Sequence, residues 1–136
     1  MTTLTQDRNT LRRDGQQMEP PVAANTRIFG GGMVCINTAG LAVPVAVSTT
    51  LKCVGVAEQQ ADNRNGAAGD VRVKVRKGVF AFNNSSAGDA IGLADVGNTC
   101  FMVSDQTVAK TNGTNTRSAA GTVFDVDAEG VWVRFV

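Results

Sequence analysis

The stretch DVRVKVRK, Asp70–Lys77, carries the clearest structural signal in the sequence. Val71, Val73 and Val75 alternate strictly with basic residues, and this is the period of a β-strand that buries one face and exposes the other. The stretch therefore predicts a half-buried strand, and its neighbours in the chain decide whether the whole fold is built the same way.

The segments on both sides have the same character, because short apolar runs alternate with glycine-bearing turns. Val, Thr, Gly and Ala are abundant and Leu is sparse, a composition that favours short strands over long helices. Further strands are expected at Thr26–Phe29, Met33–Ile36, Leu41–Val47, Lys52–Ala57, Val79–Phe82, Ile91–Leu93, Cys100–Val103, Gly121–Val126 and Val131–Val136. The predicted fold class is all-β, a compact β-barrel or sandwich of short strands.

Few segments favour anything other than strand or turn. Asp127–Gly130 has the composition of a hairpin loop between the last two strands. Helix is expected in two short segments at most, Leu4–Gln17 and Gln59–Asn63.

The chain also contains an internal similarity. The stretch VGVAEQQADNRNGAAGDVRVKV, residues 54–75, and the stretch AAGTVFDVDAEGVWVRF, residues 119–135, both lead from a small-residue strand through a loop into an alternating strand. Two similar halves would explain this, although many β proteins repeat strand, turn and strand without any duplication.

Length, charge and cysteine content restrict the class of protein. A chain of 136 residues fits one body, here residues 26–136, preceded by an extended arm over residues 1–25. The formal charge of +1 predicts no general attraction to nucleic acid or to anionic membranes. Neither a membrane-spanning run nor a signal peptide is recognisable, so synthesis in a cytoplasm is expected. Cys35, Cys53 and Cys100 are odd in number and lie among apolar residues, as small buried side chains do.

The residues that most enzymes use are absent or isolated. The sequence has no histidine and no tyrosine, so the commonest general base and metal ligand are missing. Cys53 follows Lys52 but lies in an apolar strand pattern, and Asp125, Asp127 and Glu129 suit a hairpin tip better than a cation site. Neither an enzyme nor a cofactor or metal is therefore expected.

The basic side chains of the alternating strand form the strongest competing signal. Arg72, Lys74, Arg76 and Lys77 are expected to make an exposed ridge that could contact phosphates. Proteins that bind single strands usually interleave aromatic residues with such charges, whereas the interleaved residues here are valines. A ridge that faces solvent or an acidic protein surface is the preferred interpretation, and nucleic-acid binding stays as the alternative.

The polar arm is the second candidate contact region. Leu4, Leu11 and Met18 recur at one regular interval and are expected to fill pockets on a partner, on a neighbouring copy or on the body itself. Arginine forks can bind carboxylates or carbonyls on the same surface, and the arm supplies three, Arg8, Arg12 and Arg13. In the last strand Val131 and Val133 share one face, so Trp132 on the other face is a candidate subunit contact.

These pieces, in this order, resemble a known family. The sequences GGMVCINTAGLAVPV, CVGVAEQQAD, AGDVRVKVRKGVFAF and SSAGDAIGLAD are similar to those of the small capsid decoration (cement) proteins of tailed bacteriophages that have a compact β-barrel body. The resemblance covers residues 26–136 and rests on Gly55–Ala57, Gly69–Val73, Gly78–Phe80 and Ala87–Ile91.

The resemblance implies a structural role in the virion. Copies would bind the outside of the phage head and bridge neighbouring subunits of the major capsid protein, as a homo-oligomer, with a trimer favoured over a dimer. The protein would be made in the bacterial cytoplasm and would end on the head exterior. The alternatives are another structural β-module of the head or tail and, less favoured, a nucleic-acid-binding β-barrel.

Overall fold

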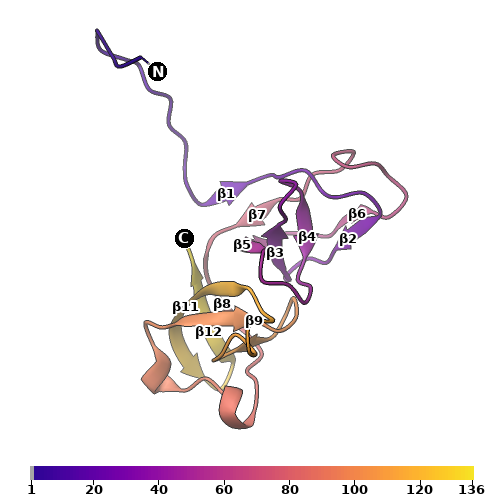
Figure 1. The fold of residues 1–136 in the computed structure, drawn as a ribbon, viewed down its shortest axis with the longest axis vertical. Helices are drawn as coiled ribbons and strands as arrows, with labels where there is room; N and C mark the ends of the chain where they lie inside the picture. Colours follow the sequence, from indigo (N-terminus) through magenta and orange to yellow (C-terminus); the bar gives the residue numbers. More distant parts are fainter. Residues whose placement is uncertain (1) are drawn as a thin grey trace.

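The fold is all-β, as the sequence predicts. The computed structural model describes residues 2–136, and they form two five-stranded sheets and one two-stranded sheet (Figure 1). The strands are β1 Gln17–Met18, β2 Thr26–Ile28, β3 Met33–Ile36, β4 Ala42–Pro44, β5 Lys52–Ala57, β6 Ala61–Asn63, β7 Val75–Arg76, β8 Gly78–Phe82, β9 Thr99–Met102, β10 Val108–Ala109, β11 Ala119–Asp127 and β12 Gly130–Phe135. Two single 3₁₀ turns, η1 Ala87–Asp89 and η2 Leu93–Asp95, lie between β8 and β9.

The two large sheets have the same topology. The first sheet has the strand order β1-β7-β5-β3-β4, and the second has the order β8-β12-β11-β9-β10. Without β2 and β6, which form the small sheet, each half of the chain contributes five strands to its own large sheet. Counted along the chain, the first of the five pairs with the fifth, the fifth with the fourth, the fourth with the second, and the second with the third. All of these pairs are antiparallel. The internal similarity in the sequence therefore corresponds to two halves with one architecture.

The correspondence holds at the level of single residue pairs. Val34 pairs with Gly55 in the first sheet as Cys100 pairs with Gly121 in the second. Both ladders then shift register at the next position. A one-residue bulge conserved at the same place in both halves is a specific feature of a strand pair, so it supports the equivalence more strongly than strand order alone.

A close approach of two backbones explains why glycine occupies both positions. A Cβ atom added to Gly55, which has φ 144°, would lie 2.5 Å from the carbonyl oxygen of Arg76. A Cβ atom on Gly121 would collide with the carbonyl oxygen of Arg134 in the same manner. Only a residue without a side chain fits where the fourth strand of each half crosses its last strand.

The two sheets share one hydrophobic core, and the first sheet has another on its opposite face. Met33, Cys35 and Val56 of the first sheet pack with a large group from the second sheet that includes Val131 and Val133. The other face of the first sheet is covered by residues that include Ile28 and Ala61, from the small sheet formed by β2 and β6. The structure is a layered sandwich, and no full strand pair closes either large sheet into a barrel. In each half a single parallel bridge joins the two outer edges, Val22 to Ala42 in the first and Asn83 to Thr107 in the second.

The alternation in Asp70–Lys77 is confirmed by burial, since Val73 and Val75 are buried and Arg72 and Lys74 are exposed. Regular pairing is limited to Val75–Arg76, with one isolated bridge from Arg72 to Pro21. The hairpin predicted at Asp127–Gly130 is also confirmed, because these two residues close the β11–β12 ladder.

Three local predictions are wrong. Ile91–Leu93 is not a strand, because Ile91 inserts alone into the shared core and η2 follows it. Gln59–Asn63 contains strand β6 instead of a helical turn, since Ala61 and Asn63 face the body and pair with β2. Leu4–Gln17 is not helical, and its side chains are exposed throughout.

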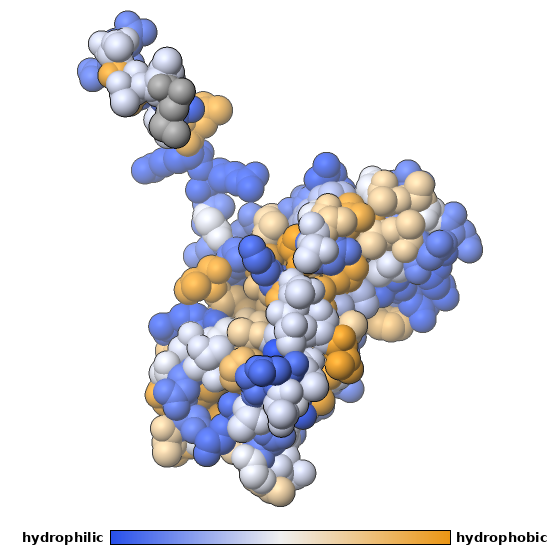
Figure 2. Space-filling model, in the orientation of Figure 1, coloured by the Kyte–Doolittle hydropathy of each residue, from blue (hydrophilic) through white to orange (hydrophobic). Residues whose placement is uncertain are grey.

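The N-terminal arm is shorter than the expected residues 1–25. Residues 2–14, here called the free arm, stand clear of the body (Figures 1 and 2). Residues 15–18, the arm root, attach to β7 through β1. Beyond them Val22 is fully buried in the core between the first sheet and the small β2–β6 sheet, here called the second core. Residues 19–25 therefore belong to the body.

Substitution of either crossing glycine should destabilise the fold. Gly55→Ala and Gly121→Ala each force a side chain against a carbonyl oxygen and should each lower the free energy of unfolding by about 1–3 kcal/mol. Gly88→Ala is the matched control, because nothing lies within 4 Å of a Cβ there. Urea unfolding measures all three, and equal stability of Gly55→Ala and Gly88→Ala would contradict the account.

Candidate functional site

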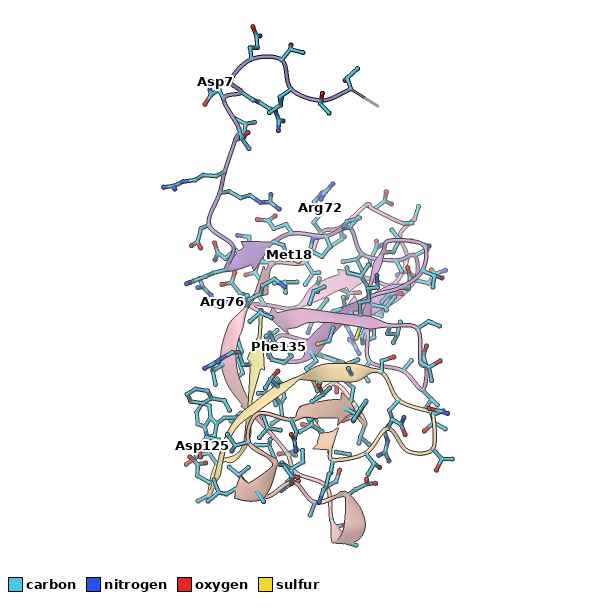
Figure 3. The ribbon with its side chains drawn as sticks, turned by 60° about the vertical axis from the view of Figure 1, so that its left-hand side comes forward. Asp7, Met18, Arg72, Arg76, Asp125 and Phe135 are labelled. Carbon is cyan, nitrogen blue, oxygen red and sulfur yellow. The ribbon has the colours of Figure 1, made fainter. Side chains whose placement is uncertain are left out.

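The free arm presents most of the contact residues predicted from the sequence. Leu4 and Leu11 are 72% and 89% exposed, and Arg8, Arg12 and Arg13 are exposed as well. The arm extends away from both sheets, and Asp7 lies far from the body (Figure 3). Apart from contacts between near neighbours, no hydrogen bond or ion pair within residues 2–136 holds the free arm.

Met18 differs from the other predicted arm contacts. It is half-buried and packs against the second core, on which β1 lies. Its contact is therefore made within the chain, and the regular spacing of Leu4, Leu11 and Met18 does not give three equivalent anchors. The pattern could not reveal this, because the partner of β1 is β7, far along the sequence.

The arm root is held by a polar cluster that the sequence did not indicate. Glu58 accepts a hydrogen bond from Arg76 Nε at 2.7 Å and another from Gln17 Nε2 at 3.2 Å. The hydrogen bond from Arg76 is the main cause of a lowered pKa of Glu58. Glu58 is an isolated acid in the sequence, and only the pairing of β1, β7 and β5 brings these three side chains together.

The four basic residues do not form one free ridge. Arg72 donates to the carbonyl oxygen of Glu19 at 2.7 Å, and Arg76 is paired with Glu58. Lys77 Nζ donates to the carbonyl oxygens of Val54 and Val136 at 3.0 and 3.1 Å. Of the four, Lys74 alone has no side-chain hydrogen bond or ion pair among the described residues. These contacts hold the arm root and join the halves, which weakens the case for a phosphate-binding surface.

Trp132 lies on the outer face of the second sheet. It is half-buried in β12, between Asp125 of β11 and Ala81 of β8. On the same sheet the guanidinium of Arg134 stacks over the ring of Phe124 at 4.8 Å, and Phe124 is 47% exposed. At the equivalent position of the first sheet, Arg76 pairs with Glu58 and not with an aromatic ring.

The cysteines lie near one another in the shared core. Cys35 and Cys53 are directly opposite each other on β3 and β5. Donation of a hydrogen bond from Cys35 lowers the pKa of Cys53, with help from Gly55 and the ammonium of Lys77, and raises that of Cys35. Burial raises the pKa of Cys100 to about 11. The Sγ of Cys35 also lies 3.5 Å from Sδ of Met102, to which it donates. Cys53 is half-buried, whereas Cys35 and Cys100 are buried.

Two of the three acidic residues considered for a cation site, Asp125 and Asp127, accept hydrogen bonds from nearby backbone amides. Asp125 accepts a hydrogen bond from the backbone of Val126, and Asp127 accepts one from Glu129. Within residues 2–136 no three Cys, Asp or Glu side chains converge as a metal site would require. In the same part of the chain no helix has the length and apolar character needed to cross a membrane.

Comparison of the chain with protein-family models, with curated proteins and with solved structures gives no match. The arguments about function below therefore rest on the residues of this chain and on their geometry.

Alkylation should distinguish the three thiols. Iodoacetamide at about pH 8 should modify Cys53 first, because its pKa is lowered and its side chain, unlike those of Cys35 and Cys100, is partly accessible. Cys35→Ala removes the hydrogen-bond donor and should slow the reaction of Cys53, whereas Cys35→Ser keeps a donor and should slow it less. Mass spectrometry of peptides reports each site, and equally fast modification of Cys100 in the folded protein would contradict the assignment.

Proposed function

We propose that the protein is a structural virion protein that binds the outer surface of a phage head and cements neighbouring subunits of the major capsid protein. The observation that carries this proposal is the free arm, a polar segment with exposed leucine and arginine side chains on a rigid β body. Such a segment gains order only from a partner surface. The sequence resemblance to capsid decoration proteins supplies the class of partner.

The energetics of the arm favour a lattice over a single partner molecule. Fixing the backbone costs roughly 1–2 kcal/mol per residue, while burying a leucine side chain contributes about 1.5–3 kcal/mol. Leu4 and Leu11 cannot offset the ordering of the whole arm, so arginine–carboxylate contacts must add to them. Binding is therefore weak for each contact and becomes firm when several arms of one oligomer engage adjacent capsid subunits.

The body suits the same role. Two sheets that share one core present their outer loops at fixed positions, and the arm root is fixed to that body by Glu58, Arg76 and Gln17. A homo-oligomer, with a trimer favoured and a dimer as the alternative, would place several arms around one point of the head. Under this proposal the protein is made in the bacterial cytoplasm and joins the head exterior.

Binding to empty expanded heads of the phage that encodes the chain tests the proposal. The wild-type protein should co-sediment with the heads at a saturating ratio of hundreds of copies per head, and it should raise the temperature at which they disrupt. Leu4→Asp should weaken binding about tenfold or more, because a buried leucine contact is lost. Val47→Asp is the matched control, since Val47 is 86% exposed on the body and should leave binding unchanged.

Failure of the wild-type protein to bind such heads would refute the proposal. A saturating ratio of about a dozen copies or fewer would instead assign the protein to a head–tail connector or a tail module. Salt-sensitive binding to DNA that depends on Lys74 would favour the nucleic-acid alternative.

A further inference from the structure

The short ladder between β1 and β7 has a register that continues beyond its two paired residues. Gln17 pairs with Arg76 and Met18 with Val75. On one side the amide of Val73 donates to the carbonyl of Pro20 at 3.2 Å, and on the other the amide of Lys77 donates to the carbonyl of Gln16 at 2.8 Å. All four couples follow one uninterrupted antiparallel register, in which the next partners along the chain belong to β8.

β8 has an open edge in line with this ladder. It is the outer strand of the second sheet and pairs there with β12. Its outer edge is open along Gly78–Phe82 and ends at Asn83, whose amide and carbonyl are bonded to Gln106 and Val108. The carbonyl of Arg134 is directed at β11, where it faces Gly121, so its partner Val79 turns its amide and carbonyl away from β12. Ala81, two residues on, does the same. The amides and carbonyls of Val79 and Ala81 thus continue the series of backbone donors begun by Val73, which binds Pro20, and Lys77, which binds Gln16 of the arm root.

The chain's own free arm does not use this edge. The backbone turns at Gly15 and Gln16, where the amide of Gln16 donates to Asp14 Oδ1 at 3.2 Å. From that turn the free arm leads away from β8 into solvent (Figures 1 and 3). One molecule therefore carries both an unpaired strand edge and an unpaired extended segment, and it does not bring them together.

We propose that the open edge of β8 is the docking site for residues 11–14 of the free arm of a second copy. The incoming segment adds to the second sheet as one further antiparallel strand, in the register set by the arm root. Arg12 then lies opposite Ala81 and Asp14 opposite Val79. Unpaired edges readily accept a strand, and exchange of an identical segment about a hinge is a low-cost route to an oligomer.

The surface beside the edge matches the side chains of the segment. A groove of about 440 Å³ lies between β8 and the first sheet and is lined by Val56, Glu58, Arg76, Phe80, Ala81 and Phe82, among others. In the extended register Leu11 falls opposite Phe82 and Arg13 opposite Phe80, so both face the groove. Leucine meets a phenyl ring there, and the guanidinium approaches the carboxylate of Glu58, which it would share with Arg76. The apolar and basic residues of the segment thus meet apolar and acidic partners.

A second copy is the favoured occupant because the turn at Gly15 and Gln16 separates the free arm from its own β8. The arm root stays on its own β7, and the crossing between molecules takes place at the turn. This inference does not rest on the proposed function, since the exchange takes place between copies in solution. In such an oligomer Leu11, Arg12 and Arg13 are bound by the neighbouring copy, and the capsid contacts of the proposed function fall to Leu4 and Arg8, which remain outside the docked segment.

Oligomeric state in solution, measured by size-exclusion chromatography with light scattering and without any phage heads, provides the first test. The wild-type chain should be a dimer or trimer. Deletion of residues 2–14 should give a folded monomer, because these residues make no contact with the body. Ala81→Pro removes the amide that faces the edge and should also give a monomer, whereas Ala81→Val keeps that amide and should remain oligomeric. Circular dichroism reports folding of each variant.

Cross-linking identifies which molecule supplies the arm. Co-expressed Arg12→Cys and Ala81→Cys chains, treated with a short bis-maleimide, should give a linked species that contains one of each chain. Ala39→Cys, on an exposed turn, replaces Ala81→Cys as the control and should give no such product.

Three outcomes would overturn the proposal: a monomeric wild-type chain, an oligomer unchanged by deletion of the free arm, or no link between the Arg12→Cys and Ala81→Cys chains beyond that seen with the Ala39→Cys control. A wild-type oligomer that fails to bind phage heads would leave this proposal intact and refute only the proposed function.

Discussion

β7 lies in the first large sheet and β8 in the second, and the single residue between them, Lys77, bonds to both halves of the molecule. Its ammonium group donates to Val54 of β5 and to Val136 after β12, while its amide holds the arm root at Gln16. Because β7 lies in one sheet and β8 in the other, this residue sets where the halves meet. The shared core, the position of β1 and the open edge of β8 all follow from that junction.

The two halves use one framework and differ mainly at their surfaces. The bulged ladders and the crossing glycines are the same, since backbone sterics allow no other residue there. The last strand of each half carries an arginine at the position after its buried valine, Arg76 or Arg134, but one binds a carboxylate and the other a phenyl ring. In the first half this arginine therefore helps to hold the arm root, and in the second it lies over an exposed phenyl ring.

Features set by local chemistry were predictable, and features set by distant partners were not. Alternating valines and the turn at Asp127–Gly130 specify strand and hairpin from neighbouring residues alone. β6 was missed because Ala61–Asn63 becomes a strand only by pairing with β2. In the candidate site, the polarity of the arm predicted its exposure, whereas the role of Glu58 depends on Gln17 and Arg76, which reach it only through sheet pairing.

The last residue of the chain lies beside the arm root. Val136 and Gln16 line the same shallow surface pocket, whereas the β11–β12 hairpin lies at the far end of the second sheet, where Asp125 is seen in Figure 3. A foreign peptide fused after Val136 would emerge on the side where the arm departs and would compete for the space around it. The same peptide inserted between Ala128 and Glu129 would point away from the arm, which makes that hairpin the better position for displaying cargo.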